Sequence, residues 1–414
     1  MKLYRNILVA AAIVIVGALP AMAQNNSMTP YSKFGYGILN DNVTSAQRNM
    51  GGVGYAMNGG RQINTMNPAS YASIDSLTFL WDIGIDVTNL WSKEGSTKGN
   101  SNGGGLNYIT MEFPIAKNVG GSFGLVPYSS VGYSFGSDLV SGSELRDGSG
   151  GITQLYGGIS YRPFKNFSLG VNGSYDFGTI VNDTYIYTSS SDESMFERVM
   201  KLRDWHVQFG VQYTTKINKT DRATIGAVFT PGKSFHGHTW GAKYDVTNST
   251  TADTIGYSSM NGDYTSPASI GGGLGYWHGE NLYGEVDFTY QGWKNAKFKS
   301  LENFESTTFD NRWKVAAGLQ WIPKLRGGYV QRINYRMGGY FTHDYINIKG
   351  SNVREYGASI GFGLPVPGGK TIVNLGFEYK HRQANPVSYI KENYFNITLG
   401  VNFNELWFWK SKIR

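Results

Sequence analysis

The stretch FSLGVNGSYDF at residues 167–177 decides the fold class of this 414-residue chain. Its odd-numbered positions are Phe, Leu, Val, Gly or Tyr, and its even-numbered positions are Ser, Gly, Asn or Asp. Such strict alternation is typical of a β-strand with one apolar and one polar face, because a helix repeats at every third or fourth residue. Residues 205–213 and 394–403 alternate in the same way. The pattern predicts strands that face lipid on one side and water on the other.

The connections between the alternating stretches are long and short in turn. The short ones carry Pro, Gly, Asn or Lys, which are residues that close hairpins. We expect long connections at residues 91–105, 134–151, 181–203, 231–267, 293–311, 344–353 and 381–393, and short ones at 115–119, 162–166, 217–222, 278–281, 322–328 and 365–370. Seven long and six short connections make thirteen, which corresponds to about fourteen strands. The sequence therefore predicts an all-β transmembrane antiparallel β-barrel of the kind found in bacterial outer membranes.

The N-terminus has the features of a secretory signal peptide. Lys2 and Arg5 give a charged start, residues 7–19 form an apolar run, and Ala21-Met22-Ala23 is a small-residue cleavage site. We predict a signal peptide at residues 1–23, an N-terminal hatch or plug at 24–76, and the transmembrane barrel at 77–414. A cleaved leader followed by a barrel predicts the outer membrane of the cell as the location.

Composition excludes several other classes of protein. Hydrophobic residues make up 40% of the chain and the mean hydropathy is −0.31, which suits a barrel with alternate apolar residues better than a bundle of membrane helices. The formal charge of +7 is spread without a basic block, so we expect no nucleic acid partner. The absence of cysteine excludes disulfides, a lipid-anchored N-terminus and thiol catalysis. A soluble β-sandwich is the alternative fold, and the loop asymmetry argues against it.

Residues 24–76 do not alternate, and they are expected to fill the lumen of the barrel. The glycines Gly51, Gly52 and Gly54 permit tight packing and positive φ angles. Further along, Asn67-Pro68-Ala69 follows, and Pro68 is expected to push Asn67 out of helical geometry.

These residues resemble the FadL-type outer-membrane transporters of hydrophobic compounds. The resemblance rests on RNMGG at 48–52, Asn-Pro-Ala at 67–69, and late strands such as PASIG at 267–271. It implies a fourteen-stranded monomeric barrel in outer-membrane lipid, with an N-terminal hatch in the lumen. It also implies passive uptake of a hydrophobic small molecule, such as a long-chain fatty acid, with sideways release into the membrane. By resemblance, Asn67, Pro68 and Ala69 belong to the hatch or the region beside the lateral opening.

Three alternatives to a carrier remain. Some FadL-like barrels act as adaptors in secretion or outer-membrane assembly complexes, and the predicted loops at 181–203 and 231–267 would then hold a protein partner. A diffusion porin is disfavoured by the plug, which would obstruct flow. An outer-membrane hydrolase is disfavoured because no spacing singles out a Ser, His and carboxylate set. We therefore expect a protein that is not an enzyme.

Candidate ligand residues are few. Arg312, Lys314 and Arg336 lie on inward faces and are candidates for binding a carboxylate headgroup, although lumen charges that keep the barrel wet are the commoner case. His236 and His238 share one strand face, but without a third ligand they predict polar-face residues, so we expect no metal and no cofactor. The sequence leaves open whether the last strand ends at Phe403 or at Phe408.

Overall fold

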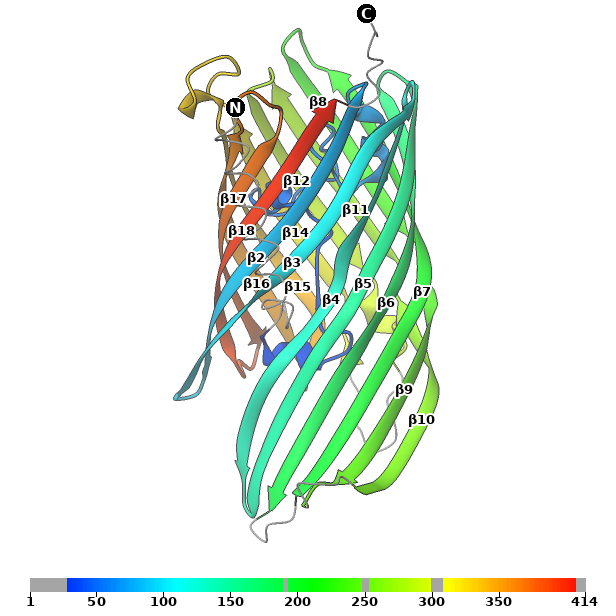
Figure 1. Ribbon diagram of the computed structural model, residues 1–414, viewed down its shortest axis with the longest axis vertical. Helices are drawn as coiled ribbons and strands as arrows, with labels where there is room; N and C mark the ends of the chain where they lie inside the picture. Colours follow the sequence, from blue (N-terminus) through cyan, green and yellow to red (C-terminus); the bar gives the residue numbers. More distant parts are fainter. Residues whose placement is uncertain (1–27, 189–192, 248–252, 299–307, 407–414) are drawn as a thin grey trace, which may run out of the picture.

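The computed structural model describes residues 28–188, 193–247, 253–298 and 308–406, and they form a closed antiparallel barrel (Figure 1). The predicted signal peptide lies outside the described residues. The wall consists of β2 (Thr78–Glu94), β3 (Thr97–Ala116), β4 (Val119–Leu139), β5 (Gly142–Phe164), β6 (Phe167–Thr188), β7 (Glu193–Lys216), β8 (Asp221–Thr230), β9 (Lys233–Asp245), β10 (Asp253–Ser266), β11 (Ser269–His278), β12 (Leu282–Gln291), β14 (Arg312–Trp321), β15 (Asn334–Ile348), β16 (Ser351–Pro365), β17 (Ile372–Asn385) and β18 (Lys391–Leu406).

These sixteen strands occupy fourteen positions around the wall. β8 and β9 are one position interrupted at residues 231–232, and β10 and β11 are one position interrupted at 267–268, so sixteen minus two is fourteen. β18 pairs with β2 over sixteen residue pairs, which closes the barrel. The predicted all-β fold and strand number are confirmed. The last strand ends at Leu406, between the two ends that the sequence left open.

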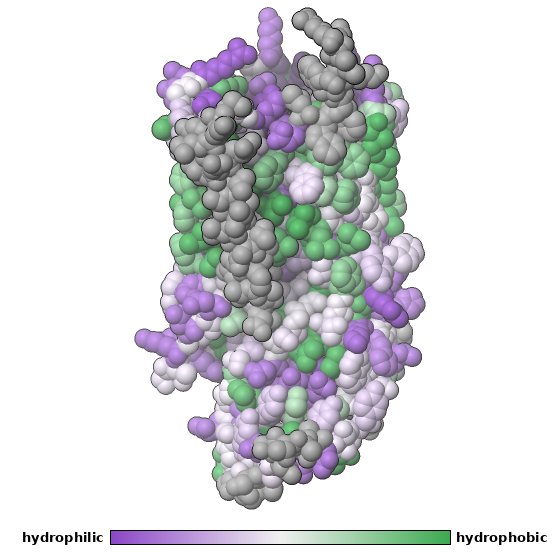
Figure 2. All heavy atoms as spheres, viewed as in Figure 1, coloured by the Kyte–Doolittle hydropathy of each residue, from purple (hydrophilic) through white to green (hydrophobic). Residues whose placement is uncertain are grey.

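Apolar side chains cover one half of the outer wall. Figure 2 shows hydrophobic residues gathered in the upper half of the molecule and hydrophilic residues in the lower half. On β6 and β7 this apolar band extends from Phe177 and Trp205, which are 39% and 61% exposed, to Leu169 and Tyr213, which are 42% and 48% exposed. Side chains this apolar are stable outside a barrel only when lipid surrounds it. The protein is therefore an integral outer-membrane barrel. The short turns, which lie at the end of the band near Leu169 and Tyr213, are periplasmic.

Several predicted long loops are wrong, because the strands continue through them. β6 ends at Thr188 and β7 begins at Glu193, so both strands extend into the predicted loop 181–203. β9 and β10 fill most of the predicted loop 231–267, and β2 to β5 enter 91–105 and 134–151 in the same way. Outside the membrane the sequence no longer alternates between apolar and polar residues, but neighbouring strands still form backbone hydrogen bonds with each other. Strand therefore continues where the sequence pattern stops. The periplasmic turn at 322–328 is longer than predicted, since β15 begins only at Asn334.

On the extracellular side of the membrane the strands of the wall differ in length. β4, β5, β6, β7, β9 and β10 form a tall sheet on the extracellular side, and we call it the extracellular wall (Figure 1). β7 pairs with β8 at residues 209–216 and with β9 at 194–202. At the other edge, β4 bulges at Pro127 and leaves β3, since their pairing stops at Ile109 and Leu125. We call the gap between β3 and β4 the seam.

Residues 28–76 contact inward-facing residues of the wall over most of their length, and we call them the plug segment. A function of this segment as a hatch stays a prediction. They contain the 3-10 helix η1 (Pro30–Lys33), the short strand β1 (Ile38–Leu39), one turn of helix α2 (Ser45–Arg48) and the 3-10 helix η2 (Pro68–Ser73). β1 pairs with Ser129 and Ser130 of β4, so the plug segment occupies part of the β4 edge that β3 leaves unpaired. The remaining short elements are η3 (Trp293–Asn295), β13 (Thr308–Phe309) and η4 (Val330–Arg332). No helix in the described ranges has the length and hydrophobicity needed to cross a membrane.

Candidate functional site in the barrel lumen

The extracellular end of the plug segment is held by aromatic packing. Tyr36 is fully buried, and its ring lies 5.5 Å from that of Trp293 and 6.4 Å from that of Phe309. Trp293 in turn lies 4.6 Å from Tyr345. The wall contributes further buried apolar residues to this cluster, namely Val131, Ile152, Ile180, Met200, Leu202, Phe235 and Tyr264. The extracellular end of the plug segment is therefore packed into a buried aromatic core.

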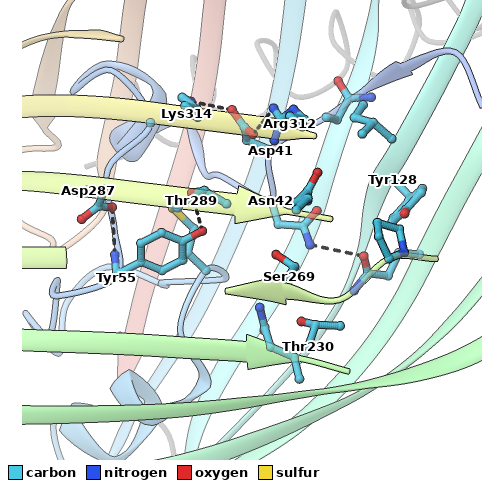
Figure 3. Close-up of a pocket in the computed structure, with 18 of the residues that line it drawn as sticks. Asp41, Asn42, Tyr55, Tyr128, Thr230, Ser269, Asp287, Thr289, Arg312 and Lys314 are labelled. Carbon is cyan, nitrogen blue, oxygen red and sulfur yellow. Dashed lines mark hydrogen bonds and ion pairs between the residues drawn. The ribbon is translucent and has the colours of Figure 1, made fainter. Parts of the chain in front are cut away.

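The middle of the plug segment is held by two carboxylates on β12. The backbone N–H groups of Gly54 and Tyr55 donate to Oδ2 of Asp287 at 2.7 and 3.2 Å. The N–H of Ala56 donates to Oε1 of Glu285 at 2.5 Å. Figure 3 shows the contact between Asp287 and Tyr55. Glu285 and Asp287 are two residues apart and both are buried, so one strand face binds three consecutive amides of the plug segment.

A third acidic contact has the opposite arrangement, with the carboxylate on the plug segment. Asp41 accepts from Arg312 at 3.0 Å and from Lys314 at 2.6 Å, and both cations come from β14 (Figure 3). The structure thus brings together two of the three candidate headgroup residues, but with a plug carboxylate between them. Arg336 lies elsewhere, donating to Gln320 and Asn374. The sequence analysis did not select Asp41, Glu285 or Asp287, because an isolated acid carries no local motif.

Asn67, Pro68 and Ala69 lie against β5, β6 and β7. Asn67 is extended, with φ −130° and ψ 108°, as Pro68 predicted, and its Oδ1 accepts from the N–H of Ala69. Its Nδ2 donates to Tyr55 O at 2.7 Å and to Val211 O at 3.2 Å, which ties the motif to both the plug segment and the wall. Beside this motif, β6 pairs with β7 without interruption at residues 167–177 and with β5 at residues 169–177, so the motif is not at the seam. Its role in a moving hatch stays a prediction.

The three predicted hatch glycines differ in their surroundings. Gly51 has φ +72°, and a Cβ atom there would lie 2.7 Å from the backbone N of Gly339, so only glycine fits. Gly52 has φ +78° and faces the flexible end of Lys314. At Gly54 the φ angle is ordinary, but a Cβ would collide with Gln47 and Met66. Packing therefore requires glycine at Gly51 and Gly54, and the positive φ favours it at Gly51 and Gly52. A part in hatch movement stays a prediction.

Inward glycines of the wall carry a signal that the sequence analysis missed. A Cβ at Gly226 would lie 1.8 Å from Tyr55 O, and one at Gly170 would lie 2.4 Å from Pro68. Equivalent collisions with the plug segment occur at Gly120, Gly210, Gly271, Gly318, Gly338, Gly361, Gly376 and Gly400. Glycines at inward positions of successive strands therefore mark where the plug segment touches the wall.

Two cavities among the described residues of the lumen are small and polar. One of about 120 Å³ is lined by Asp41, Asn42, Gln154, His206, Asp287 and Arg312 among others (Figure 3). A second of about 80 Å³ is lined mainly by charged residues, including Arg48, Glu355, Glu378 and Arg382. Cavities of this size and polarity suit water better than an alkyl chain or an aromatic ring.

A larger groove opens at the seam on the outer side of the wall. It has a volume of about 360 Å³ and is lined by Leu106, Asn107, Leu125, Pro127, Thr153 and Thr179 among others. Thr153 pairs with Phe177, so the groove lies at the extracellular boundary of the apolar band. The two histidines of the sequence analysis lie on the opposite edge of the extracellular wall. His236 contacts Asp204 and His238 contacts Asn261.

The barrel is similar to several solved outer-membrane proteins. The Pseudomonas aeruginosa FadL homologue has a TM-score of 0.60 at 13% identity, covering 88% of this chain and 99% of that one. The CymD monoaromatic hydrocarbon channel has a TM-score of 0.59 at 12% identity, covering 88% and 97%. The P. putida toluene transporter TodX has a TM-score of 0.58 at 11% identity, and the match covers 89% of this chain and 99% of that one. No curated protein sequence matched the chain.

These similarities, together with the fourteen wall positions, define an outer-membrane barrel with the FadL-type fold, as the sequence resemblance implied. At identities of 13% or less they establish the fold alone. The model of the protein family described as BamG matches residues 3–414, which is nearly the whole sequence. The chain therefore belongs to the BamG family.

Proposed function

We propose that this barrel is a non-catalytic accessory subunit of an outer-membrane protein complex, such as a secretion or assembly complex, and that it holds a partner protein outside the cell. The filled lumen is the main support for this proposal. The plug segment is held by aromatic packing at one end and by carboxylates at the middle, and two lumen cavities among the described residues are polar. A carrier needs an apolar binding pocket, whereas an adaptor needs only a rigid base and an exposed surface.

The edge of β10 that no described strand covers supplies such a surface. Among the described residues β10 pairs with β9 and otherwise only with residues 297–298, close to its C-terminal end. Residues 254–262, TIGYSSMNG, contain no charge and no proline. Ile255 and Tyr257 are 57% and 65% exposed. An unprotected strand edge is a template for pairing with another chain, and soluble surfaces usually block it with charge or proline.

The test is purification of the tagged protein from membranes in mild detergent, followed by native mass spectrometry. We expect a stoichiometric protein partner, and we expect it to be lost when Ile255→Lys and Tyr257→Lys are combined. The matched control is the double variant Asn100→Lys and Asn102→Lys, which places the same charges on the extracellular part of β3. A barrel that purifies alone, or whose partner is lost equally from both variants, would contradict the proposal.

The second candidate is passive transport of a hydrophobic compound, such as a long-chain fatty acid, with lateral release. The specific observation in its favour is the groove at the seam, which adjoins the lipid band in a FadL-type fold. The neighbours CymD and TodX are described as a hydrocarbon channel and a toluene transporter. Replacing Thr153 by Trp would fill the groove, whereas Ile159→Trp lies on the same strand and face below it. Selective loss of labelled fatty acid or toluene uptake in Thr153→Trp would favour transport over the accessory role.

A further inference from the structure

We infer that the outer face of β7 and β9 binds the phosphate-bearing headgroup of a lipid in the outer leaflet. This inference goes beyond the proposed function and does not depend on it. The position of the surface is the first argument. The apolar band of β7 ends at Trp205, and Arg203 and Lys201 follow on the same face toward the extracellular side. Side chains two and four residues beyond the band lie about 7 and 13 Å further along the strand, where lipid headgroups begin.

The second argument is the concentration of cations with tryptophan. Lys201 and Arg203 are exposed, and neither forms an ion pair among the described residues. Lys201 Nζ lies 4.9 Å from the ring of Trp240, and Lys233 Nζ lies 4.1 Å from the ring of Trp205. Tryptophan is enriched where a membrane meets water, and a cation on its face is held at that depth.

The histidines of β9 extend the same surface. His238 is exposed, pairs in register with Lys201, and stacks near Trp240 with 5.7 Å between ring centroids. The carboxylate of Asp204 is buried and contacts Lys233 at 2.5 Å and His236 at 2.8 Å. This carboxylate offsets part of the charge of Lys233 and His236, which leaves Lys201 and Arg203 as the cations available to a ligand.

Acidic residues bound the surface on its extracellular side. Asp147, Asp183 and Glu197 are partners in register on β5, β6 and β7, and Glu197 lies four residues beyond Lys201. An anion is therefore attracted to one level only, between the apolar band and this acidic row. A soluble anion would have no reason to prefer a surface beside lipid, whereas a headgroup is carried there by its acyl chains. Arg and Lys together suit a phosphate monoester, since Arg donates two parallel hydrogen bonds and Lys adds a point charge.

The test uses the full-length mature protein in detergent, titrated with bisphosphorylated lipid A and followed by native mass spectrometry. Wild-type protein is expected to bind one lipid, and the K201Q/R203Q variant is expected to bind it roughly 30-fold more weakly. K201R/R203K keeps both charges and is expected to bind as wild type. The matched control K165Q/K219Q removes two exposed cations at periplasmic turns and is expected to change nothing.

Two further probes distinguish the source of the phosphate. Dephosphorylated lipid A is expected to bind as weakly to wild type as the bisphosphorylated form does to K201Q/R203Q. Inorganic phosphate is not expected to compete with the lipid. Equal binding of both lipids, equal binding by wild type and K201Q/R203Q, or full competition by inorganic phosphate would overturn the inference. Heat-modifiable mobility in electrophoresis verifies that each variant is folded.

Discussion

The extracellular end and the middle of the plug segment lie in the same lumen but are stabilised by different interactions. Residues 31–39 are packed into an aromatic cluster and add neutral hydrogen bonds, such as those of Tyr36 with Tyr345 and Thr265. Residues 41–72 have less aromatic packing and are fixed mainly by hydrogen bonds to inward carboxylates, amides and cations. Aromatic packing excludes water without specifying direction, whereas hydrogen bonds to a carboxylate specify both distance and direction. The extracellular end is therefore stabilised mainly by apolar packing, and the middle mainly by charged hydrogen bonds.

The absence of native cysteine allows each region to carry its own reporter. Ser32→Cys lies in the aromatic region and Ser70→Cys in the polar region, and both serines are at most 4% exposed. The rate of maleimide labelling at each reporter measures local opening of the plug segment. A change at one reporter only would show that the two regions open independently.

The largest effect is expected from Trp293→Ala. Trp293 is 1% exposed and contacts the rings of Tyr36, Phe309 and Tyr345, so truncation leaves a cavity and costs about 3–5 kcal/mol locally. Labelling of Ser32→Cys should become much faster, while Ser70→Cys should change little. Trp321→Ala, on the lipid face, is the control and should affect neither reporter. Equal acceleration at both reporters would contradict independent regions.

A somewhat smaller effect is expected from Asp41→Asn, with a cost of about 2–3 kcal/mol. The substitution leaves Arg312 and Lys314 beside each other without their carboxylate. Because Asp41 joins the two regions, both reporters should label faster. Combining it with Lys314→Met should restore part of the loss, since one of the unpaired cations is then gone. Failure of that rescue would show that the ion pair is not what fixes this part of the plug segment.

Replacing Asp287 by Asn should cost about 2 kcal/mol, because two backbone N–H groups lose a charged acceptor. Ser70→Cys is the reporter expected to respond, with Ser32→Cys nearly unchanged. The control Asp221→Asn removes an acid from a periplasmic turn that does not contact the plug segment. If Ser32→Cys responds more strongly than Ser70→Cys, the division into two regions is wrong.

A cost of about 1 kcal/mol is expected from Asn67→Ala, which removes the cap of η2 and the bond to Tyr55 O. Asn67→Asp keeps the acceptor for Ala69 N–H but loses the donor to Tyr55 O. Labelling of Ser70→Cys should therefore rank wild type, Asn67→Asp and Asn67→Ala from slowest to fastest. The same rate in all three would mean that the Asn-Pro-Ala motif has no holding role.

The smallest effect concerns the extracellular wall, where Asp183 lies between Asp147 and Glu197 in register. Burial, with Glu197 and Asp147 beside it, raises the pKa of Asp183 to about 6. A raised pKa for an acid means that the folded state binds more protons, so the stability of this region is highest below pH 4 and falls as the pH rises to 6. After solvent screening the loss is about 1 kcal/mol at most. Hydrogen exchange of β6 at pH 7.5 should slow in Asp183→Asn, and the difference should vanish near pH 4.

Much of the fold was determined by local sequence. Residues 167–177 and 205–213 alternate because lipid and water each require their own side chains, and this requirement acts on every residue of a membrane strand. The alternation and the turn residues predicted the barrel, the strand number and the membrane location, and the structure confirms them. The signal peptide stays a prediction. The extended geometry of Asn67 followed from Pro68 alone, since the proline ring restricts the residue before it.

The extent of the extracellular wall and the contacts of the plug segment were decided only by tertiary structure. Strand beyond the membrane depends on a neighbouring backbone, not on its own side chains, so residues 181–203 and 231–267 resembled loops. Asp41 and Arg312 are 271 residues apart in sequence, and Gly54 and Asp287 are 233 apart. Such contacts leave no local pattern, because the closed barrel alone brings those residues together.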